Sequence, residues 1–230
     1  MKGESEKITI VIPAYNESRT IGRLIKQLLK NGYSEVVVVD DGSQDETFRQ
    51  AQKAGAEVLR LPINRGTGGA LRTGFEFVLK EKKAEIVVMM DADLQHKVED
   101  IEKLIEPIRK KEAEVVIGSR LLKQASRMPF FRRVANWLGN LVTFLLTGLR
   151  VSDSQSGFRA IKREALEKMK LKSNRFEICS EMISEIARLK LSWREVPIST
   201  VYTSYSLSKG QNWRNGFKTL ARLLAIKFQR

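Results

Sequence analysis

The chain has 230 residues, of which 42% are hydrophobic and 30% charged, and its formal net charge at pH 7 is +14. These values fit a globular protein with one large domain and exclude a disordered chain. The positive charge indicates an anionic partner: a nucleic acid, an anionic lipid or a phosphorylated substrate. The single cysteine, Cys179, excludes an intrachain disulfide and a cysteine-based zinc site, and we expect it in the core of a reducing-compartment protein.

Short apolar runs alternate with helical patterns through the first half of the chain. The predicted strands span residues 7–12, 35–39, 57–61, 85–90 and 114–118, and the predicted helices span residues 18–31, 45–54, 68–82 and 98–110. This alternation predicts an α/β fold whose doubly wound, mostly parallel sheet carries helices on both faces. No repeat, linker or low-complexity segment interrupts the pattern, so we expect one domain.

The most informative stretch is the apolar run 86–90, which ends in Asp91, Ala92 and Asp93. Side chains at positions i and i+2 of an extended chain point the same way, so the two carboxylates can converge. Open α/β sheets bind their ligands at the carboxyl ends of parallel strands. Two hard oxygen ligands there suit Mg²⁺ or Mn²⁺ shared with substrate phosphates, although the same triplet also occurs in ordinary polar turns.

Two further polar loops follow predicted strands: residues 13–17 after the first strand and residues 40–43 after the second. Asp, Asn and Gly residues belong in turns, so either loop alone could be a plain connection. Because parallel strands end at one edge of a sheet, we expect all three loops to converge there. The pattern therefore predicts a ligand site at this edge.

A glycine-rich segment, residues 64–69, follows the third predicted strand and opens a helix. It does not fit the dinucleotide-binding pattern, because Leu71 stands at the third glycine position and the segment does not follow the first strand. A helix start of this kind still offers backbone N–H groups to an anion. His96, the only histidine, is interpreted as a helix cap or pocket contact, with a catalytic base as the alternative.

Four segments resemble motifs of family 2 glycosyltransferases with the GT-A fold: residues 11–17, 38–47, 64–66 and 91–96. Within that family the chain most resembles the polyprenyl-phosphate, or dolichol-phosphate, mannose and glucose synthases. The match follows the family's order from residue 8 to residue 210. It implies a GT-A catalytic domain over residues 1–210, followed by a C-terminal segment of residues 211–230.

The resemblance also implies roles for individual residues. The base and ribose of a UDP- or GDP-sugar are expected to contact Pro13, Tyr15, Glu17, Asp40 and Asp41. Mg²⁺ or Mn²⁺ and the diphosphate are expected to lie among Asp91, Asp93 and Gln95. Further substrate contacts are expected at Gly66 and Ala92. Two positions depart from the family pattern, since Thr67 stands where many relatives have lysine and the usual prolines after His96 are missing.

From residue 115 to residue 163 the chain carries nine basic residues and one acidic residue, Asp153. They flank an uncharged run, residues 134–149, that is too short and too polar to span a membrane. Basic residues beside an apolar helix suit an anionic amphiphile or a membrane interface, and the alternative is a core helix. The resemblance implies that the acceptor phosphate is held by Arg120, Arg132 and Arg133, with Arg120 and Arg133 in a catalytic role.

Two carboxylates are candidates on the acceptor side. Residues 151–159 resemble the family's Asp-x-x-x-Gly-Phe-Arg segment, whose aspartate, here Asp153, lies near the acceptor. The predicted helix 176–190 carries Glu177, Glu181 and Glu185 at i, i+4 spacing, which normally forms a solvated stripe. The resemblance brings one of these carboxylates to the active site, and we expect Glu181. A phosphate acceptor is already an anion, whereas a hydroxyl acceptor would need Asp153 or Glu181 as a base.

Residues 202–210 resemble the family's mobile loop over the nucleotide, in which Lys209 is expected to contact the diphosphate. The arginine that many synthases have upstream in this loop is missing. Residues 211–230 contain no acid and show apolar residues at helical spacing, which predicts a basic amphipathic helix. We expect this helix at a membrane interface, with packing on the domain or on a second subunit as alternatives.

Together these features predict a metal-dependent, inverting glycosyltransferase that moves a hexose from a GDP-mannose or UDP-glucose type of donor to a polyprenyl phosphate. It is expected to be peripheral on the cytoplasmic face of the membrane, and a homo-oligomer is left open. One alternative is an enzyme of the same fold that acts on a saccharide or other hydroxyl acceptor. A basic nucleic-acid-binding protein is disfavoured by the acidic strand ends and by the lack of a recognisable nucleic-acid-binding motif.

Overall fold

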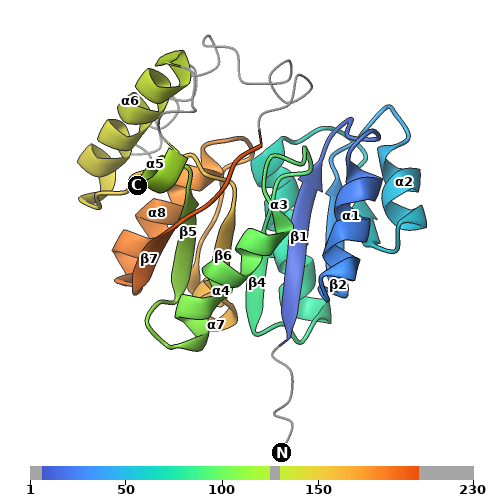
Figure 1. Cartoon of the computed structure of the whole chain (residues 1–230), viewed down its shortest axis with the longest axis horizontal. Coiled ribbons are helices and arrows are strands. Elements are labelled where there is room, and N and C mark those ends of the chain that lie inside the picture. The colour runs from blue at the N-terminus through green and yellow to red at the C-terminus, as the bar shows by residue number, and fades with distance from the viewer. Residues whose placement is uncertain (1–6, 125–129, 202–230) are drawn as a thin grey trace, which may run out of the picture.

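The computed structural model describes residues 7–124 and 130–201, and it leaves out the side chains of residues 123–135. A seven-stranded sheet forms its centre, in the order β3-β2-β1-β4-β6-β5-β7 (Figure 1). The strands are β1 (Ile8–Ala14), β2 (Glu35–Asp40), β3 (Glu57–Arg60), β4 (Ile86–Met89), β5 (Val115–Ser119), β6 (Arg159–Lys162) and β7 (Trp193–Pro197). Neighbouring strands pair in parallel, except that β6 runs antiparallel to both β4 and β5. The predicted mostly parallel α/β sheet is confirmed, while β6 and β7 were not among the predicted strands.

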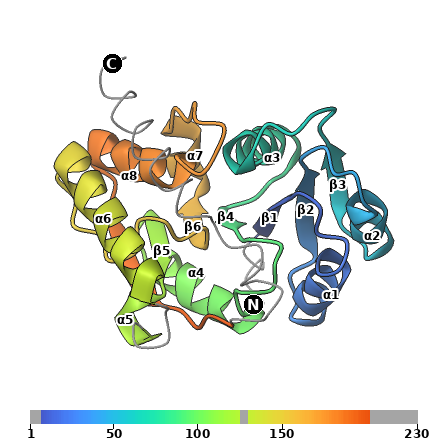
Figure 2. The same ribbon diagram turned by 90° about the horizontal axis from the view of Figure 1, so that it is seen from above.

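Helices cover both faces of this sheet (Figure 2). They are α1 (Ile21–Lys30), α2 (Thr47–Lys53), α3 (Thr67–Glu81), the short 3-10 turn η1 (Val98–Asp100), α4 (Ile101–Arg109), α5 (Leu121–Gln124), α6 (Phe130–Thr147), α7 (Arg163–Lys168) and α8 (Ile178–Leu189). Helices α1, α2 and α4 contribute to one hydrophobic core, and α3, α7 and α8 contribute to a second. The five helices predicted within the described residues, 18–31, 45–54, 68–82, 98–110 and 176–190, are confirmed, with ends shifted by a few residues.

The central strands are buried on both faces, which explains their uninterrupted apolar sequences. In β1, Ile10 and Ile12 belong to the first core, whereas Val11 between them belongs to the second. The same alternation places Val38 and Val37 of β2 in opposite cores. Each fully buried side chain of this size stabilises the fold by roughly 1.5–3 kcal/mol. The two cores therefore hold the parallel strands so that their carboxyl ends share one edge.

The reversed strand β6 determines which later segment reaches that edge. Its first residue, Arg159, pairs with Met89 at the end of β4 and with Ile117 of β5. Because β6 runs antiparallel, the loop before it, residues 150–158, arrives at the carboxyl ends of β4 and β5. Helix α6 lies at the periphery, against α8, at the upper left of Figure 1. The topology thus brings the loop of residues 150–158 close to Asp91.

Candidate active site

The aspartate pair directly follows the buried strand β4, as predicted. Asp91 Oδ2 lies 3.1 Å from His96 Nε2, and the Asp91 side chain remains 43% exposed. Asp93 accepts a hydrogen bond from the backbone N–H of Gln95 at 3.0 Å and another from the Gln95 side-chain amide. The loop therefore presents two carboxylates at the sheet edge, each held by one neighbouring polar side chain.

The two carboxylates differ in their tendency to ionise. Burial raises the pKa of Asp91, but the hydrogen bond and charge of His96 and the charge of Arg120 outweigh it and lower that pKa overall. Burial raises the pKa of Asp93, and the negative charge of Asp91 raises it further. Solvent reaches the Asp91 side chain, and its contact with His96 is the main cause that lowers its pKa. A cation shared by both carboxylates would relieve their mutual repulsion.

This pair fits a divalent ion that is completed by a substrate. Within residues 7–124 and 130–201, no group of three or more His, Cys, Asp or Glu residues is arranged to hold a metal ion. Mg²⁺ is commonly bound through one or two carboxylates while substrate phosphates and water supply the remaining ligands. Asp91 and Asp93 would hold such an ion. Gln95, the third predicted ligand, is placed beside them, with its amide N–H directed to Asp93.

The loops after β1 and β2 are joined by hydrogen bonds. The backbone N–H of Asn16 donates to the Ser43 hydroxyl at 2.9 Å, and that of Glu17 donates to the Thr47 hydroxyl at 2.7 Å. The Asn16 side chain in turn accepts a hydrogen bond from the Gln44 backbone at 2.9 Å. Pro13 lies within β1, and Tyr15 is exposed at the tip of this loop. The predicted base and ribose contacts after both strands therefore lie side by side.

The two aspartates after β2 have different surroundings. Asp40 is fully buried; its Oδ1 accepts the Ser43 backbone N–H at 3.1 Å, and its Oδ2 lies 3.3 Å from Arg60 Nε. Asp41 accepts the backbone N–H groups of Arg65 at 2.7 Å and Gly66 at 2.8 Å. Burial raises the pKa of Asp41, and these two hydrogen bonds oppose the rise. The visible role of Asp41 is thus to hold the glycine-rich turn, and its predicted ribose contact stays a prediction.

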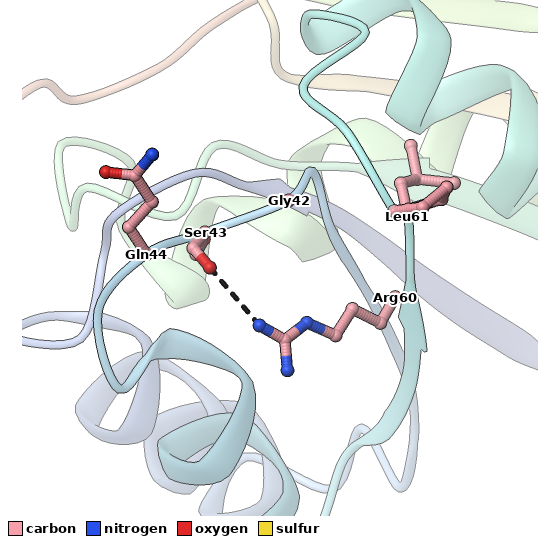
Figure 3. A pocket seen from close by; sticks show the side chains of 6 residues that line it. Gly42, Ser43, Gln44, Arg60 and Leu61 are labelled. Atoms are coloured by element: carbon pink, nitrogen blue, oxygen red, sulfur yellow. Dashed lines mark hydrogen bonds between the residues drawn. The ribbon is translucent and has the colours of Figure 1, made fainter.

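Beside these loops the surface is hollowed. A cavity of about 510 Å³ is lined by Gly42, Ser43, Gln44, Arg60, Leu61 and Pro62. Figure 3 shows Arg60 reaching across it to Ser43, whose backbone carbonyl accepts a hydrogen bond at 3.3 Å. The Arg60 guanidinium also lies 5.3 Å from the ring centre of Phe48. Sequence reasoning missed Arg60, because nothing in the short strand β3 distinguishes this arginine from a solvated one.

The glycine-rich turn is shaped by a close approach of backbone. A side chain at Gly66 would lie 2.6 Å from the carbonyl oxygen of Asn174, and one at Gly68 would lie 2.5 Å from that of Ser173. The Gly69 N–H donates to the Asn174 carbonyl at 2.9 Å. The sequence predicted that backbone N–H groups of this turn could bind an anion. Those of Gly66 and Gly69 instead donate hydrogen bonds to Asp41 and to the Asn174 carbonyl. That expectation is wrong for these two groups.

Arg120 and Asp153, both predicted to lie near the acceptor, form a two-pronged ion pair. Arg120 Nε and Nη2 each lie 2.7 Å from one oxygen of Asp153, and the Arg120 backbone N–H adds a third bond at 3.1 Å. Asn136 of α6 donates to Asp153 at 3.1 Å. Burial raises the pKa of Asp153, but the charge and hydrogen bonds of Arg120 lower it overall. The hydrogen bonds to Asp153 hold the Arg120 side chain in one orientation. The predicted catalytic role of Asp153 stays a prediction.

Several neighbours hold the loop that carries Asp153. The Asn140 side chain of α6 accepts the Ser154 N–H at 2.9 Å, and Glu195 of β7 accepts the Ser152 N–H at 2.9 Å. The fully buried Arg159 donates to the carbonyls of Ser154, Ser156 and Cys179 at 2.8, 3.0 and 2.9 Å. Sequence reasoning missed Asn140 and Glu195, which lie far from the loop along the chain and belong to no local motif.

The glutamates at the start and along α8 do not form the solvated stripe that their spacing normally gives, because Glu177, Glu181 and Glu185 are all buried. Glu181 accepts the backbone N–H groups of Lys172 at 2.9 Å and Ser173 at 2.8 Å, and Glu185 accepts that of Lys170 at 2.8 Å. These bonds hold the segment that packs against the glycine-rich turn. The contacts give Glu181 a structural role, and its predicted catalytic role stays a prediction.

Three predicted side chains lie outside the described residues. Arg132 and Arg133 belong to α6, but their side chains lie outside the described residues, as do Lys209 and the C-terminal segment 211–230. The last described residues are nevertheless informative: Thr200 forms a β-bridge with His96, and the Val201 N–H donates to the Gln95 carbonyl at 3.0 Å. No helix within the described ranges is long and apolar enough to cross a membrane.

Comparisons with known sequences point to one family. The sequence model described as "Glycosyl transferase family 2" matches residues 9–170. The chain is 38% identical over 241 aligned positions to the UDP-N-acetylglucosamine–dolichyl-phosphate N-acetylglucosaminyltransferase of Methanococcus voltae, covering 96% of each protein. It is 35% identical over 188 positions to the dolichol-phosphate mannosyltransferase of Pyrococcus furiosus, covering 77% of this chain and 52% of that protein.

A solved structure shares the fold. Glucosyl-3-phosphoglycerate synthase from Mycobacterium tuberculosis aligns with a TM-score of 0.75 at 21% identity, covering 96% of this chain and 78% of that one. A further structure of that enzyme contains Mn²⁺ and uridine diphosphate. The fold, the acidic strand ends and the sequence matches lead to one assignment. The chain belongs to glycosyl transferase family 2, has the GT-A fold and is a glycosyltransferase.

Proposed function

We propose that the protein transfers a sugar from a nucleotide diphosphate to the phosphate of a polyprenyl lipid, with inversion at the sugar. The observation that carries this proposal is the two-pronged pairing of Arg120 with the buried Asp153, in a place from which the charge of Arg120 also lowers the pKa of Asp91. A guanidinium oriented by a buried carboxylate is a suitable group to hold a phosphate. Arg120 would hold the acceptor phosphate next to the donor's diphosphate.

Each group at the sheet edge has a distinct task in this reaction. Asp91 and Asp93 would hold Mg²⁺ or Mn²⁺, which, when bound, neutralises the charge that develops on the leaving diphosphate. Pro13, Tyr15, Glu17 and Asp40 would contact the base and ribose of the donor. Arg60 and Gln44 line the cavity on this side and offer further hydrogen-bond donors. The donor is proposed to be a GDP-hexose, a UDP-hexose or, from the Methanococcus voltae relative, a UDP-N-acetylhexosamine.

The described carboxylates favour a phosphate acceptor over a hydroxyl acceptor. A hydroxyl needs a base to remove its proton, whereas a phosphate attacks as an anion. Asp153 is occupied by Arg120 and Asn136, and Glu181 by two backbone N–H groups. Neither predicted base is free to accept a proton from an acceptor. A phosphate needs no such base, so this geometry supports the lipid-phosphate proposal.

Helix α6 supports a lipid environment for the acceptor. Its polar residues Asn136, Asn140 and Thr143 contact the protein, through Asp153, Ser154 and Ser180 respectively. Trp137 and Leu145 lie on its outer face and are 63% and 66% exposed to solvent. An ordinary surface helix has the opposite arrangement, with apolar residues inside. We therefore propose that α6 lies at a membrane surface, with the protein peripheral on the cytoplasmic face and the segment 211–230 as a second contact.

The test is transfer of radiolabelled sugar from UDP-N-acetylglucosamine, UDP-glucose or GDP-mannose to a polyprenyl phosphate and, separately, to the matching polyprenol. We expect product with one donor and the phosphate only, dependent on added Mn²⁺ or Mg²⁺. Asp93→Asn should abolish turnover, and Arg120→Lys should raise the KM for the lipid phosphate far more than the KM for the donor. Transfer to the polyprenol or to a saccharide with equal efficiency would refute the proposed acceptor.

A further inference from the structure

The carboxylate of Asp91 is confined from two sides by residues to which the family resemblance assigns no role. On one side, His96 Nε2 lies 3.1 Å from Oδ2. On the other side lies Gly157, where an added Cβ would come within 2.7 Å of Oδ2 and 2.8 Å of Oδ1. His96 is five residues from Asp91 along the chain, whereas Gly157 is delivered from the opposite half by the reversed strand β6.

The tautomer of His96 follows from its surroundings. The ring is buried and packs on Phe158, with ring centres 4.8 Å apart. Its Nδ1 is buried and has no hydrogen-bond partner among the described residues. If the proton were on Nδ1 alone, a buried N–H would have no hydrogen-bond partner. The lone pair of Nε2 would then also face the Asp91 carboxylate and be repelled by it. His96 therefore carries a proton on Nε2, and this N–H donates a hydrogen bond to Asp91 Oδ2.

The backbone of His96 is fixed as firmly as its ring. Residue 96 forms a β-bridge with Thr200, and the preceding carbonyl, that of Gln95, accepts the Val201 N–H at 3.0 Å. Rotation of the imidazole away from Asp91 would break the packing on Phe158. The donor to Asp91 is thus held in place before any ligand binds.

Gly157 is needed for space and not for backbone conformation. It is absent from the glycines with positive φ, so an alanine could adopt its backbone without strain. The obstacle to a side chain is the Asp91 carboxylate itself, since contacts below 3.0 Å force one group to move. The carboxylate therefore occupies the space that a side chain at residue 157 would need, and its Oδ2 is hydrogen-bonded to His96.

We propose that His96 and Gly157 are positioning residues that fix the orientation of Asp91 for a divalent cation; this inference rests on the proposed metal site. His96 occupies Oδ2 and stabilises the ionised carboxylate, which leaves Oδ1 to face the ion. Gly157 keeps open the space into which the carboxylate is turned. Partners that hold a metal-ligating carboxylate or imidazole typically change metal affinity 10- to 100-fold when they are removed.

The experiment measures the dissociation constant of Mn²⁺ by electron paramagnetic resonance, with and without uridine or guanosine diphosphate, on the full chain. His96→Leu removes the donor and keeps an apolar side chain against Phe158, so we expect Mn²⁺ to bind about 10- to 100-fold more weakly. His96→Gln can place an amide N–H where Nε2 lies, so we expect it to restore most of that affinity. This restoration is a result that a purely structural role of His96 would not give.

Gly157→Ala tests the second contact, and we expect a loss of Mn²⁺ affinity of about 10-fold or more. Its matched control is Gly22→Ala in α1, where the nearest atom to an added Cβ lies 3.7 Å away. This control should bind Mn²⁺ like the wild type. Melting temperatures of all variants show whether each one is folded.

The outcomes separate this inference from the proposed function. Wild-type affinity in His96→Leu and Gly157→Ala would refute the positioning role and leave the glycosyltransferase proposal standing. Equal losses in His96→Leu and His96→Gln would also refute it, because packing and not the hydrogen bond would then matter. Failure of the wild-type protein to bind Mn²⁺ with either nucleotide would overturn the metal site itself, and this inference with it.

Discussion

Replacement of Asp153 by asparagine tests the acceptor half of the site most directly. The carboxylate is fully buried and accepts two hydrogen bonds from the Arg120 guanidinium, one from the Arg120 backbone and one from Asn136. Breaking a buried ion pair by removing one partner typically costs about 3–5 kcal/mol. Asparagine keeps the volume and one acceptor oxygen, and the Arg120 side chain is 23% exposed, so we expect a loss of about 2–3 kcal/mol.

This loss should appear as a lower melting temperature. For a chain of this length, 1 kcal/mol corresponds to about 2–4 °C, so Asp153→Asn should melt about 4–12 °C below the wild type at pH 7. The matched control is Glu76→Gln, the same chemical change in the exposed Glu76–Lys80 pair. Surface pairs of this kind contribute little, so the control should shift the melting temperature by less than about 2 °C.

The pH dependence follows from the lowered pKa of Asp153. In the unfolded chain an aspartate has a pKa near 3.9, and in the folded chain this one is lower. As the pH falls, the unfolded state therefore takes up the proton at a higher pH than the folded state does. The stabilisation by Asp153 is complete above about pH 4 and is lost as the pH falls through the folded-state pKa. The difference in melting temperature between wild type and Asp153→Asn should accordingly shrink below about pH 4.

The same variant should impair the acceptor more than the donor. Without its two-pronged partner, Arg120 loses its orientation, so the KM for the lipid phosphate should rise while the affinity for the nucleotide-sugar stays within about two- to threefold of wild type. Kinetics with each substrate varied in turn, together with the melting curves, provide the measurement. If Asp153→Asn matched the wild type in melting temperature and in acceptor KM, the assignment of Asp153 as the orienting partner of Arg120 would be refuted.

Three further predictions follow from the site and its surroundings. Asp41→Ala removes two backbone hydrogen bonds to a carboxylate and should destabilise the fold by roughly 2–4 kcal/mol in denaturant titrations; an unchanged transition midpoint would contradict this. Glu181→Gln should keep kcat within about tenfold of wild type, whereas a loss of 1,000-fold would restore the catalytic assignment. Trp137→Ser combined with Leu145→Ser should reduce co-sedimentation with anionic phospholipid vesicles without lowering the melting temperature, and undiminished binding would count against α6 as a membrane contact.

The sequence alone determined the sheet and the position of the site within it. Strands buried on both faces must be apolar throughout, so runs such as residues 86–90 were recognisable without tertiary information. Their polar continuations, Asp40–Asp41 and Asp91–Ala92–Asp93, were equally local, and the carboxyl ends of parallel strands meet by geometry. These features depend on neighbours along the chain, which is why the pattern identified them correctly.

Only the tertiary structure decided what each polar side chain does. Asp153 and Arg120 are 33 residues apart, and Gly157 reaches Asp91 because β6 is inserted antiparallel between β4 and β5. The glutamates of α8 have the spacing of a solvated stripe, yet they are buried against backbone N–H groups of a loop. Periodicity reports which face of an element is apolar, but not which distant backbone or charge will satisfy a buried polar group. The partner of a buried polar group is determined only when the helices and strands pack together.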